Sequence, residues 1–369
     1  MRVKLVTLGC AKNLVDSEYI AGGLQSSGVE FTDDTEDIDA LIINTCGFIE
    51  SAKEESIDTI FDAVALKKQG KCSKVIVTGC LSQRYGPDLR MEIPELDGIY
   101  GNRNLKRIVQ EIALQLNLQQ ELLGERQLLS PRHYAYLKIS EGCEHPCTFC
   151  AIPGIRGNFQ SKPIETLVDE SRMLAEKGVK ELVLIAQDST VYGQDIYGEK
   201  KLPDLLRALS QVEAIEWIRL MYAYPYSMTD ELIATIAETE KVCNYLDMPV
   251  QHVSDFMLKR MARRVTGKKQ HGLIEKLRRS IPGFALRTSV IVGFPGETAA
   301  DFAQLYDYVS EGHFDRLGVF VYSQEEDTPA ATFPGQVPEN IKRERQDLLI
   351  QAQDSVTLEK NNALRGKEV

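Results

Sequence analysis

Short apolar runs alternate with helix-like amphipathic segments along this sequence. In the first third, residues 2–9 (RVKLVTLG), 39–45 (DALIINT) and 74–79 (KVIVTG) are apolar runs, and each is followed by a helical pattern. Strand-length apolar runs that alternate with helical patterns are typical of parallel βα units. The pattern therefore predicts an N-terminal domain over residues 1–116, built on a parallel sheet.

The alternation stops over residues 117–133 (NLQQELLGERQLLSPRH), which we interpret as a linker, and then resumes. Six further strand candidates follow: 134–140, 181–187, 215–224, 244–250, 284–293 and 315–322. Six βα units in series predict a partial (β/α)6 barrel over 134–337, and a final helix is expected at 338–361 within a C-terminal segment 338–369. The predicted fold class is α/β, with a parallel βα domain followed by the partial barrel.

Composition narrows the class of protein. The chain is 43% hydrophobic and 26% charged, as globular proteins are. Its N-terminus has no long apolar run, and no stretch approaches the roughly 18 apolar residues of a membrane helix. We therefore expect a cytoplasmic protein with no membrane partner. Thiols stay reduced in that compartment, so clustered cysteines indicate metal binding or chemistry rather than disulfides.

The charge of the chain is acidic overall, with one local exception. A formal net charge of −11 disfavours broad nonspecific binding to nucleic acid and suits a basic protein partner. Residues 258–280 carry nine Lys or Arg residues and one acid, Glu275. We interpret this segment as a solvated helical face, and the alternative is a contact surface for ribosomal RNA or tRNA.

Three of the eight cysteines lie close together in EGCEHPCTFC: Cys143, Cys147 and Cys150. Three is an odd number for disulfides and one short of a closed zinc site. Two completions remain open, a zinc knuckle that includes His145 or an iron–sulfur cubane with one open iron. The strand candidate at 134–140 runs into this segment, and barrel active sites lie at the carboxyl ends of strands.

A second group of three cysteines follows from the predicted topology. Cys10, Cys46 and Cys80 each come directly after one of the first three strand candidates. The carboxyl ends of parallel strands share one sheet edge, so these thiols can meet at one site. The alternative is three unrelated strand-end thiols. Cys72 is expected in a loop, and Cys243 in a strand or core.

Polar residues at or inside the barrel strands are further candidates. Gln187, Asp188 and Gln251 end apolar runs, where they either face the site or cap the strands. Arg219 and Arg287 lie inside apolar strands, and a buried arginine needs a partner. Inside a barrel, that partner could be the carboxylate of a cofactor or substrate.

The C-x3-C-x2-C spacing of Cys143, Cys147 and Cys150 resembles the signature of the radical SAM superfamily. The resemblance implies a 4Fe-4S cluster on these cysteines, whose open iron binds S-adenosylmethionine and whose electron releases a 5′-deoxyadenosyl radical. Phe149 matches the aromatic residue that lies near the adenine in that superfamily. The segment TSVIVGFPGET (288–298), with Gly293 and Gly296, resembles its glycine-containing strand-end motif at the adenine.

With the N-terminal cysteines included, the chain resembles the radical SAM methylthiotransferases. That family carries a second 4Fe-4S cluster on its N-terminal domain, which implies Cys10, Cys46 and Cys80 as ligands. TLGCAKNLVDSE (7–18) and AQDSTVYG (186–193) resemble the branch that acts on a ribosomal protein, whereas the tRNA branch typically reads GCQMN at the first place.

This resemblance implies a reaction and its partners. The substrate is an aspartate of ribosomal protein S-twelve of the small subunit, and the product is its β-methylthio derivative. The β-carbon is unactivated, so a general base cannot remove its hydrogen efficiently. The reaction uses two molecules of S-adenosylmethionine and needs a low-potential electron donor such as a flavodoxin. Contact with nucleic acid is not required.

Alternatives remain at this point. They are a tRNA adenosine methylthiotransferase, a non-catalytic iron–sulfur carrier and a zinc-binding interaction protein. Lys12 and Asn13 either begin a helix or line the cavity near the auxiliary cluster. The family usually continues into a small β-rich TRAM domain. This sequence ends about where that domain begins, so we expect it to be absent.

Overall fold

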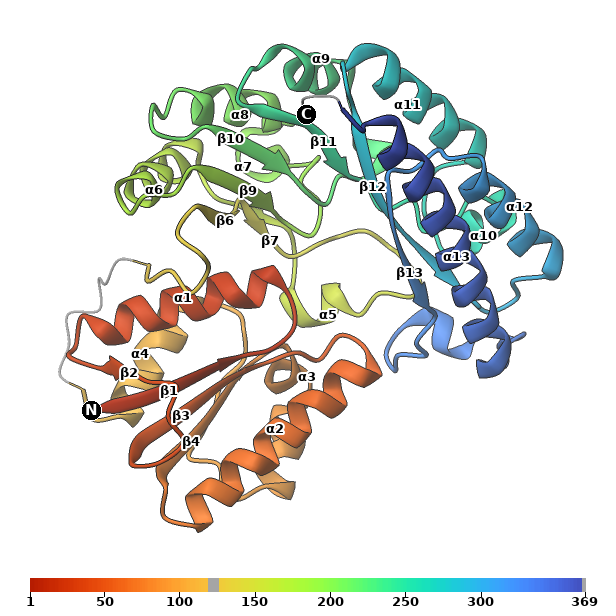
Figure 1. Ribbon diagram of the computed structural model, residues 1–369. Helices are drawn as coiled ribbons and strands as arrows, with labels where there is room; N and C mark the ends of the chain where they lie inside the picture. The colour runs from red at the N-terminus through yellow and green to blue at the C-terminus, as the bar shows by residue number, and fades with distance from the viewer. Residues whose placement is uncertain (119–125, 367–369) are drawn as a thin grey trace. The chain divides into compact units, whose positions relative to one another are not determined.

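A computed structural model describes residues 1–118 and 126–366 of the chain (Figure 1). The chain divides into two compact units, Met1–Lys138 with Ala151–Asn158, and Ile139–Cys150 with Phe159–Val369. Part of the predicted linker at 117–133, residues 119–125, lies outside the described residues. Within the described ranges, no helix is long and apolar enough to cross a membrane.

The first unit is built on a five-stranded parallel sheet of order β2-β1-β3-β4-β5. The strands are β1 (Arg2–Thr7), β2 (Glu30–Phe31), β3 (Ile38–Thr45), β4 (Cys72–Gly79) and β5 (Gly98–Ile99). The helices are α1 (Ala11–Gln25), α2 (Glu50–Lys68), α3 (Cys80–Glu92), α4 (Leu105–Gln115) and the short α5 (Ile152–Arg156). These elements confirm the predicted parallel βα arrangement.

Both faces of this sheet are covered by helices. Successive side chains of a strand point to opposite faces, so a central strand buried on both sides is apolar throughout. In β3, Ile42 packs with α1 and α4, and its neighbour Ile43 packs with α2 and α3. Burial of each isoleucine contributes about 1.5–3 kcal/mol.

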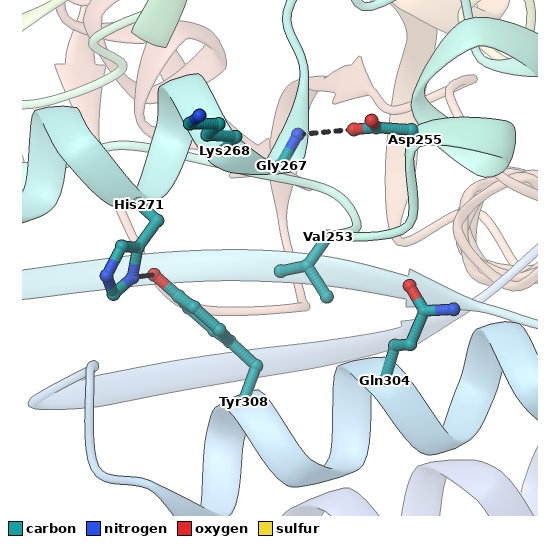
Figure 2. A pocket seen from close by; sticks show the side chains of 7 residues that line it. All are labelled: Val253, Asp255, Gly267, Lys268, His271, Gln304 and Tyr308. Atoms are coloured by element: carbon teal, nitrogen blue, oxygen red, sulfur yellow. Dashed lines mark hydrogen bonds between the residues drawn. The ribbon is translucent and has the colours of Figure 1, made fainter.

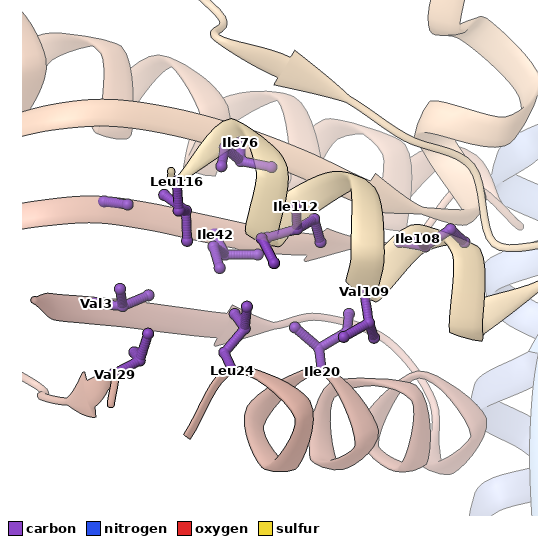
Figure 3. Close-up of a cluster of buried hydrophobic side chains, with 12 residues drawn as sticks. Val3, Ile20, Leu24, Val29, Ile42, Ile76, Ile108, Val109, Ile112 and Leu116 are labelled. Atoms are coloured by element: carbon purple, nitrogen blue, oxygen red, sulfur yellow. The ribbon is translucent and has the colours of Figure 1, made fainter. Parts of the chain in front are cut away.

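Figure 3 shows the core on the α1–α4 face. Val3, Ile42 and Ile76 reach it from three strands, and the helices contribute side chains one or two turns apart. The helical members are Ile20, Leu24, Ile108, Val109, Ile112 and Ala113.

A six-stranded sheet has the order β13-β12-β11-β10-β9-β6. Its strands are β6 (Tyr134–Lys138), β9 (Glu181–Ile185), β10 (Trp217–Leu220), β11 (Val242–Asp247), β12 (Ala285–Val292) and β13 (Arg316–Val321). The pairs from β9 to β13 are parallel. This is the predicted series of barrel strands. Two short strands, β7 (Ser140–Glu141) and β8 (Gln160–Ser161), pair separately in antiparallel fashion.

Helices follow the strands of the second unit in the predicted rhythm. They are α6 (Ile164–Glu176), α7 (Gln194–Tyr197), α8 (Leu202–Ser210), α9 (Asp230–Glu238), α10 (Asp255–Arg260), α11 (Gly267–Ser280), α12 (Ala299–Ser310) and the final α13 (Glu339–Ala363). Strand β12 alternates between fully buried and half-buried residues, so it has one face against helices and one face toward the barrel interior.

Some predicted elements differ from the observed ones. Cys72 is the first residue of β4 and is buried in the core beside α2, so its assignment to a loop was wrong. Cys243 lies in β11, as predicted. The strand predicted at 215–224 is shorter, because Tyr222 has a φ of 59° and turns the chain out of the sheet after β10.

Candidate functional site

The ends of three neighbouring strands carry Cys10, Cys46 and Cys80. Strands β1, β3 and β4 are in register up to their last residues, so their carboxyl ends lie at one edge of the first unit's sheet. Gly9 has a φ of +88°, and a Cβ built on it would lie 2.8 Å from the Cys46 sulfur. Only glycine allows the chain before Cys10 to pass this close to Cys46. The structure therefore brings these strand ends together.

The thiols of this group share a buried electrostatic environment. Burial is the largest effect on both thiols: it raises the pKa of Cys46 above its ordinary value. It raises the pKa of Cys80 to about 11. Cys10 acts on both thiols to raise the pKa further, and the Arg156 guanidinium acts to lower it. If all three thiols lost their protons, the buried thiolates would repel one another, so the ionised form needs a bound cation. The irons of a cluster supply that charge, so the donor set fits such a group.

Asn13 holds the three strand ends in place. It is fully buried near the start of α1. Its Nδ2 donates to the carbonyl oxygens of Leu8 and Thr45, at 2.8 and 3.0 Å, just before Cys10 and Cys46. Its Oδ1 lies 3.7 Å from the Cys80 sulfur. Lys12 and Asn13 belong to α1, as the first sequence alternative predicts. Asn13 also contacts a candidate ligand, and its place in a cavity near a cluster stays a prediction.

Two further side chains at this site were not identified from the sequence. The amide of Asn102 donates to the Cys80 sulfur at 3.2 Å. Arg156 donates to Asn13 Oδ1 at 2.6 Å and pairs with Asp16 at 3.3 Å, and Lys138 also pairs with Asp16. Buried charges need such partners. Asn102 and Arg156 are far in sequence from the three cysteines, and no local motif identifies either residue.

Helix α5 is packed onto the same site. Ile155 and Ala151 form a buried apolar cluster with Cys80. Arg103 donates to the carbonyl oxygens of Gly154 and Ile155, at 2.5 and 3.1 Å. The segment 151–158 therefore closes one side of the N-terminal cysteine group.

The second unit presents Cys143, Cys147 and Cys150 on a loop, each half-buried. Thr148 fixes this loop, donating from its backbone N to Met261 O at 3.2 Å and from its hydroxyl to Arg260 O at 3.0 Å. Its own carbonyl accepts from Ala330 N at 2.9 Å. The loop is thus anchored between two segments of the second unit, while its three sulfurs remain partly accessible.

A buried arginine contacts this loop. Arg263 donates from Nη1 to the Cys147 sulfur at 3.6 Å and from Nη2 to Pro249 O at 2.6 Å. Its guanidinium lies 3.9 Å from the centre of the Tyr224 ring. Burial raises the pKa of Cys143 to about 11, and Arg263 acts to lower it. Sequence reasoning missed Arg263 because it belongs to a segment rich in other cations.

His145 is oriented by its neighbours in the second unit. Its Nε2 lies 2.6 Å from Asp188 Oδ2, and its ring stacks on Tyr224 at 4.1 Å. Asp188 is buried and also accepts from Thr190 N. Within the described residues, no group of three or more Cys, His, Asp or Glu residues could hold a single metal ion. In a cubane each cysteine binds a different iron, so the three sulfurs need no common point.

The aromatic and glycine candidates lie together. The Phe149 ring packs edge-on against Phe294, 6.4 Å between ring centres, and Phe294 follows Gly293. Gly293 and Gly296 have φ values of 70° and 83°. A Cβ on Gly293 would lie 2.2 Å from Lys342 Cγ, so a lysine of α13 occupies the space above that glycine. The role of these residues in holding a cofactor stays a prediction.

The glutamine candidates have specific backbone and side-chain geometry. Gln187 donates to Glu141 Oε1 at 3.0 Å, and its own Oε1 is buried with no partner among the described residues. Gln251 has a φ of 69° and bridges to Val290, which extends the end of β11 toward β12. Gln187 therefore keeps one polar atom available for a ligand.

The two strand arginines are paired with carboxylates of the protein itself. Arg219 lies 2.5 Å from Glu181 Oε1, and Arg287 lies 2.7 Å from Asp247 Oδ1. Their side chains are 34% and 39% exposed. None of their contacts in the described part of the chain reaches the cysteine loop. A ligand carboxylate is therefore not needed to balance their charge, and their binding role stays a prediction.

Comparison with known proteins agrees with this geometry. Residues 2–101 match the family model described as Uncharacterized protein family UPF0004, and residues 137–309 match the Radical SAM superfamily. The structure resembles the radical S-adenosylmethionine methyltransferase TsrM from Kitasatospora setae, with a TM-score of 0.64 at 13% identity, covering 89% of this chain and 76% of that one. The parallel barrel sheet with its cysteine loop thus defines a radical SAM protein, a class that uses an iron–sulfur cluster and S-adenosylmethionine.

Full-length relatives narrow the family. The chain is 47% identical over 378 residues to "Ribosomal protein uS12 methylthiotransferase RimO" of Clostridioides difficile (strain 630), covering 100% of this chain and 85% of the relative. It is 48% identical over 375 residues to the protein of the same name from Geobacter sulfurreducens, covering 98% and 84%. The chain belongs to the family of the uS12 methylthiotransferases.

Proposed function

We propose that this chain adds a methylthio group to the β-carbon of an aspartate in uS12, the S-twelve protein of the small ribosomal subunit. The proposal assigns one 4Fe-4S cluster to Cys10, Cys46 and Cys80, and one to the loop of Cys143, Cys147 and Cys150. The observation that carries this proposal is the N-terminal cysteine group around Asn13. Radical cleavage of S-adenosylmethionine alone needs only the cysteine loop, so a second group of three cysteines supports a second task.

The chemistry demands a radical. Cys143, Cys147 and Cys150 would hold a cluster that, together with S-adenosylmethionine, would supply a carbon radical able to take hydrogen from an unactivated carbon. The protein contributes binding and orientation. Arg263 places a positive charge beside Cys147, and Asp188 fixes the His145 ring next to the loop. A low-potential donor such as a flavodoxin provides the electron.

The N-terminal group performs a separate task in this proposal. Cys10, Cys46 and Cys80 would hold a second cluster, which would supply the sulfur for methylation by a second S-adenosylmethionine and for transfer to the aspartate. Asn13 and Asn102 orient the Cys80 thiol, and Arg156 contributes positive charge. These contacts keep three cysteines at one sheet edge and leave the rest of the coordination to a bound group.

The first test is iron and acid-labile sulfide per chain after anaerobic reconstitution. We expect about eight irons in the intact protein and about four when Cys143, Cys147 and Cys150 are all changed to alanine. About four irons falling to none would contradict the N-terminal cluster.

The second test is mass spectrometry of uS12 and of tRNA from a strain that lacks this protein. We expect uS12 to lose its methylthio group and tRNA to be unchanged. In the purified protein, Cys46→Ala should still form 5′-deoxyadenosine without methylthio transfer, and Cys143→Ala should form none. Loss of a tRNA adenosine modification with intact uS12 would favour the tRNA reaction instead.

A further inference from the structure

Four exposed cations lie around the segment that joins α10 to α11. They are Lys259, Arg264, Lys268 and Lys269, which we call the α10–α11 cations. None of their side chains makes a hydrogen bond or ion pair within the described residues, whereas Lys276 and Arg278, farther along α11, are paired with Asp230 and Asp315. Four of the nine cations of residues 258–280 are therefore exposed and, among the described residues, unpaired around the first turn of α11.

That end of α11 lies on the face that carries the cysteine loop. Helix α11 follows β11 and precedes the parallel β12, so its first turn lies at the carboxyl ends of the strands. The α10–α11 segment also touches the loop directly, since Arg260 O accepts from Thr148 and Arg263 donates to Cys147. The four cations thus belong to a segment on the same face of the barrel as the cysteine loop.

Figure 2 shows the first turn of α11 from close by, with Lys268 at the rim of a cavity of about 440 Å³. Asp255 is the one acid among the seven lining residues, and its carboxylate accepts a hydrogen bond from Gly267 N at 2.7 Å. This carboxylate holds the turn and forms no ion pair with Lys268. Asp255 keeps its own negative charge, which stands against the four positive charges of the α10–α11 cations.

The charge of the surface identifies its partner. The whole chain carries a net charge of −11, so an isolated basic patch on the active face calls for a strongly anionic neighbour. Ribosomal proteins are basic, and a basic substrate protein is repelled by this patch. The anion that surrounds a ribosomal protein is the phosphate backbone of ribosomal RNA.

We propose that the α10–α11 cations bind the phosphate backbone of ribosomal RNA next to uS12. The chain then engages its substrate in the RNA-bound form, and the RNA contact positions the aspartate loop toward the cysteine loop. This inference rests on the proposed function. Contacts with the phosphate backbone of a nucleic acid fix the position of the protein and do not depend on the base sequence.

The test uses the full chain with Lys259, Arg264, Lys268 and Lys269 all changed to alanine. A matched control changes Arg172, Lys180, Arg279 and Arg316 to alanine, which removes the same charge from exposed positions toward the opposite ends of the barrel elements. Binding of each protein to purified small subunits, and to their RNA freed of protein, is measured across salt concentrations.

We expect the slope of log affinity against log salt to fall in magnitude by roughly 3 in the α10–α11 variant, because each lost phosphate contact removes about 0.7–0.9. The control should keep the wild-type slope. Methylthiolation of uS12 in subunits should fall, while that of free uS12 should not fall. Circular dichroism and iron content establish that both variants are folded and loaded.

Each other outcome has a definite meaning. An unchanged slope on subunits would overturn the proposal, and so would an equal loss of turnover on free uS12. Binding that is reduced on subunits but unchanged on protein-free RNA would assign the surface to an acidic protein instead. Wild-type protein that binds RNA by these residues but never modifies uS12 would refute the proposed function and leave the RNA surface standing.

Discussion

The Asn13 side chain makes several of the hydrogen bonds that position the N-terminal cysteine group. Its amide donates two hydrogen bonds and its oxygen accepts one from Arg156, all in a fully buried position. A buried polar group left without its partner costs about 1–3 kcal/mol. Leu8 O, Thr45 O and Arg156 would each lose a hydrogen bond if this side chain were removed.

We predict that Asn13→Ala loosens the three strand ends and weakens cluster binding at Cys10, Cys46 and Cys80. In a protein that already carries alanine at Cys143, Cys147 and Cys150, bound iron should fall from about four per chain to well below that. Asn13→Asp should also lose iron, since a carboxylate cannot donate to Leu8 and Thr45. Iron analysis and electron paramagnetic resonance of the reduced protein give the readout.

The matched control for this prediction is Gln25→Ala, at the exposed end of the same helix. Gln25→Ala should leave iron content and the resonance spectrum unchanged. Normal iron and an unaltered spectrum in Asn13→Ala would show that the strand ends hold their positions without the amide.

At the residue scale, the cysteines are easier to predict from the sequence than the side chains that hold them in place. Each of Cys10, Cys46 and Cys80 directly follows an apolar run, and parallel topology then places them at one edge. Asn102 and Arg156 carry no such signal, because their contacts depend on how α3, α5 and the intervening loops pack. The partners of Arg219 and Arg287 were equally invisible, because Glu181 and Asp247 are ordinary strand residues until pairing is known.

At the element scale, Asp315 ties three elements of the second unit together. Its carboxylate pairs with Arg278 of α11 at 3.0 Å and Lys360 of α13 at 2.8 Å, and accepts from Leu286 N of β12 at 2.8 Å. Burial acts to raise the pKa of Asp315. The hydrogen bond from Leu286 and the two cations outweigh burial and hold that pKa below its ordinary value of 3.8.

We predict that Asp315→Asn lowers the free energy of unfolding by about 1–3 kcal/mol at neutral pH, because it leaves two cations without their carboxylate. A carboxylate with a lowered pKa contributes stability that is present above its unfolded pKa, about 3.9, and is lost as pH falls through its folded pKa. The difference between wild type and Asp315→Asn should therefore shrink as pH falls below about 4.

Thermal unfolding between pH 7 and pH 3 measures this difference. Asp354→Asn, on the exposed face of α13, serves as the control and should track the wild type at every pH. A difference that stays constant down to pH 3 would mean that the charge of Asp315 is not what stabilises the α13 contact.

The elements themselves were predictable where the apolar pattern is long. Strands β3, β4 and β12 and helix α13 follow directly from their periodicity. The two-residue strands β2 and β5 were missed, because two residues carry no periodic signal and exist as strands only through pairing. The early end of β10 was missed too, since nothing local marks the left-handed backbone of Tyr222.

At the scale of the whole molecule, the first unit is discontinuous along the chain. Residues 139–150 belong to the second unit, and residues 151–158 return to the first. Three interactions of the N-terminal site depend on this return: Ile155 against Cys80, and Arg156 with Asn13 and with Asp16. A boundary drawn at the predicted linker, 117–133, would remove all three.

We predict that a fragment of residues 1–133 binds less iron and unfolds at lower temperature than a fragment of residues 1–158. Losing Ile155 alone removes packing worth about 2–5 kcal/mol at a buried site. Both fragments are compared by calorimetry and iron analysis, with Cys143, Cys147 and Cys150 changed to alanine in the longer one. Equal iron and equal unfolding temperature would show that α5 is dispensable for the N-terminal site.

The return of residues 151–158 to the first unit also affects when that unit can fold during synthesis. A growing chain folds from its N-terminus as it emerges, usually one domain after another. Here the first unit lacks its last piece until residue 158 has left the ribosome, and the loop with Cys143, Cys147 and Cys150 is made before that piece. All six candidate ligands are therefore present in the nascent chain before the first unit can close. If the proposed function is right, the ligands of both clusters are therefore synthesised before the first unit is complete.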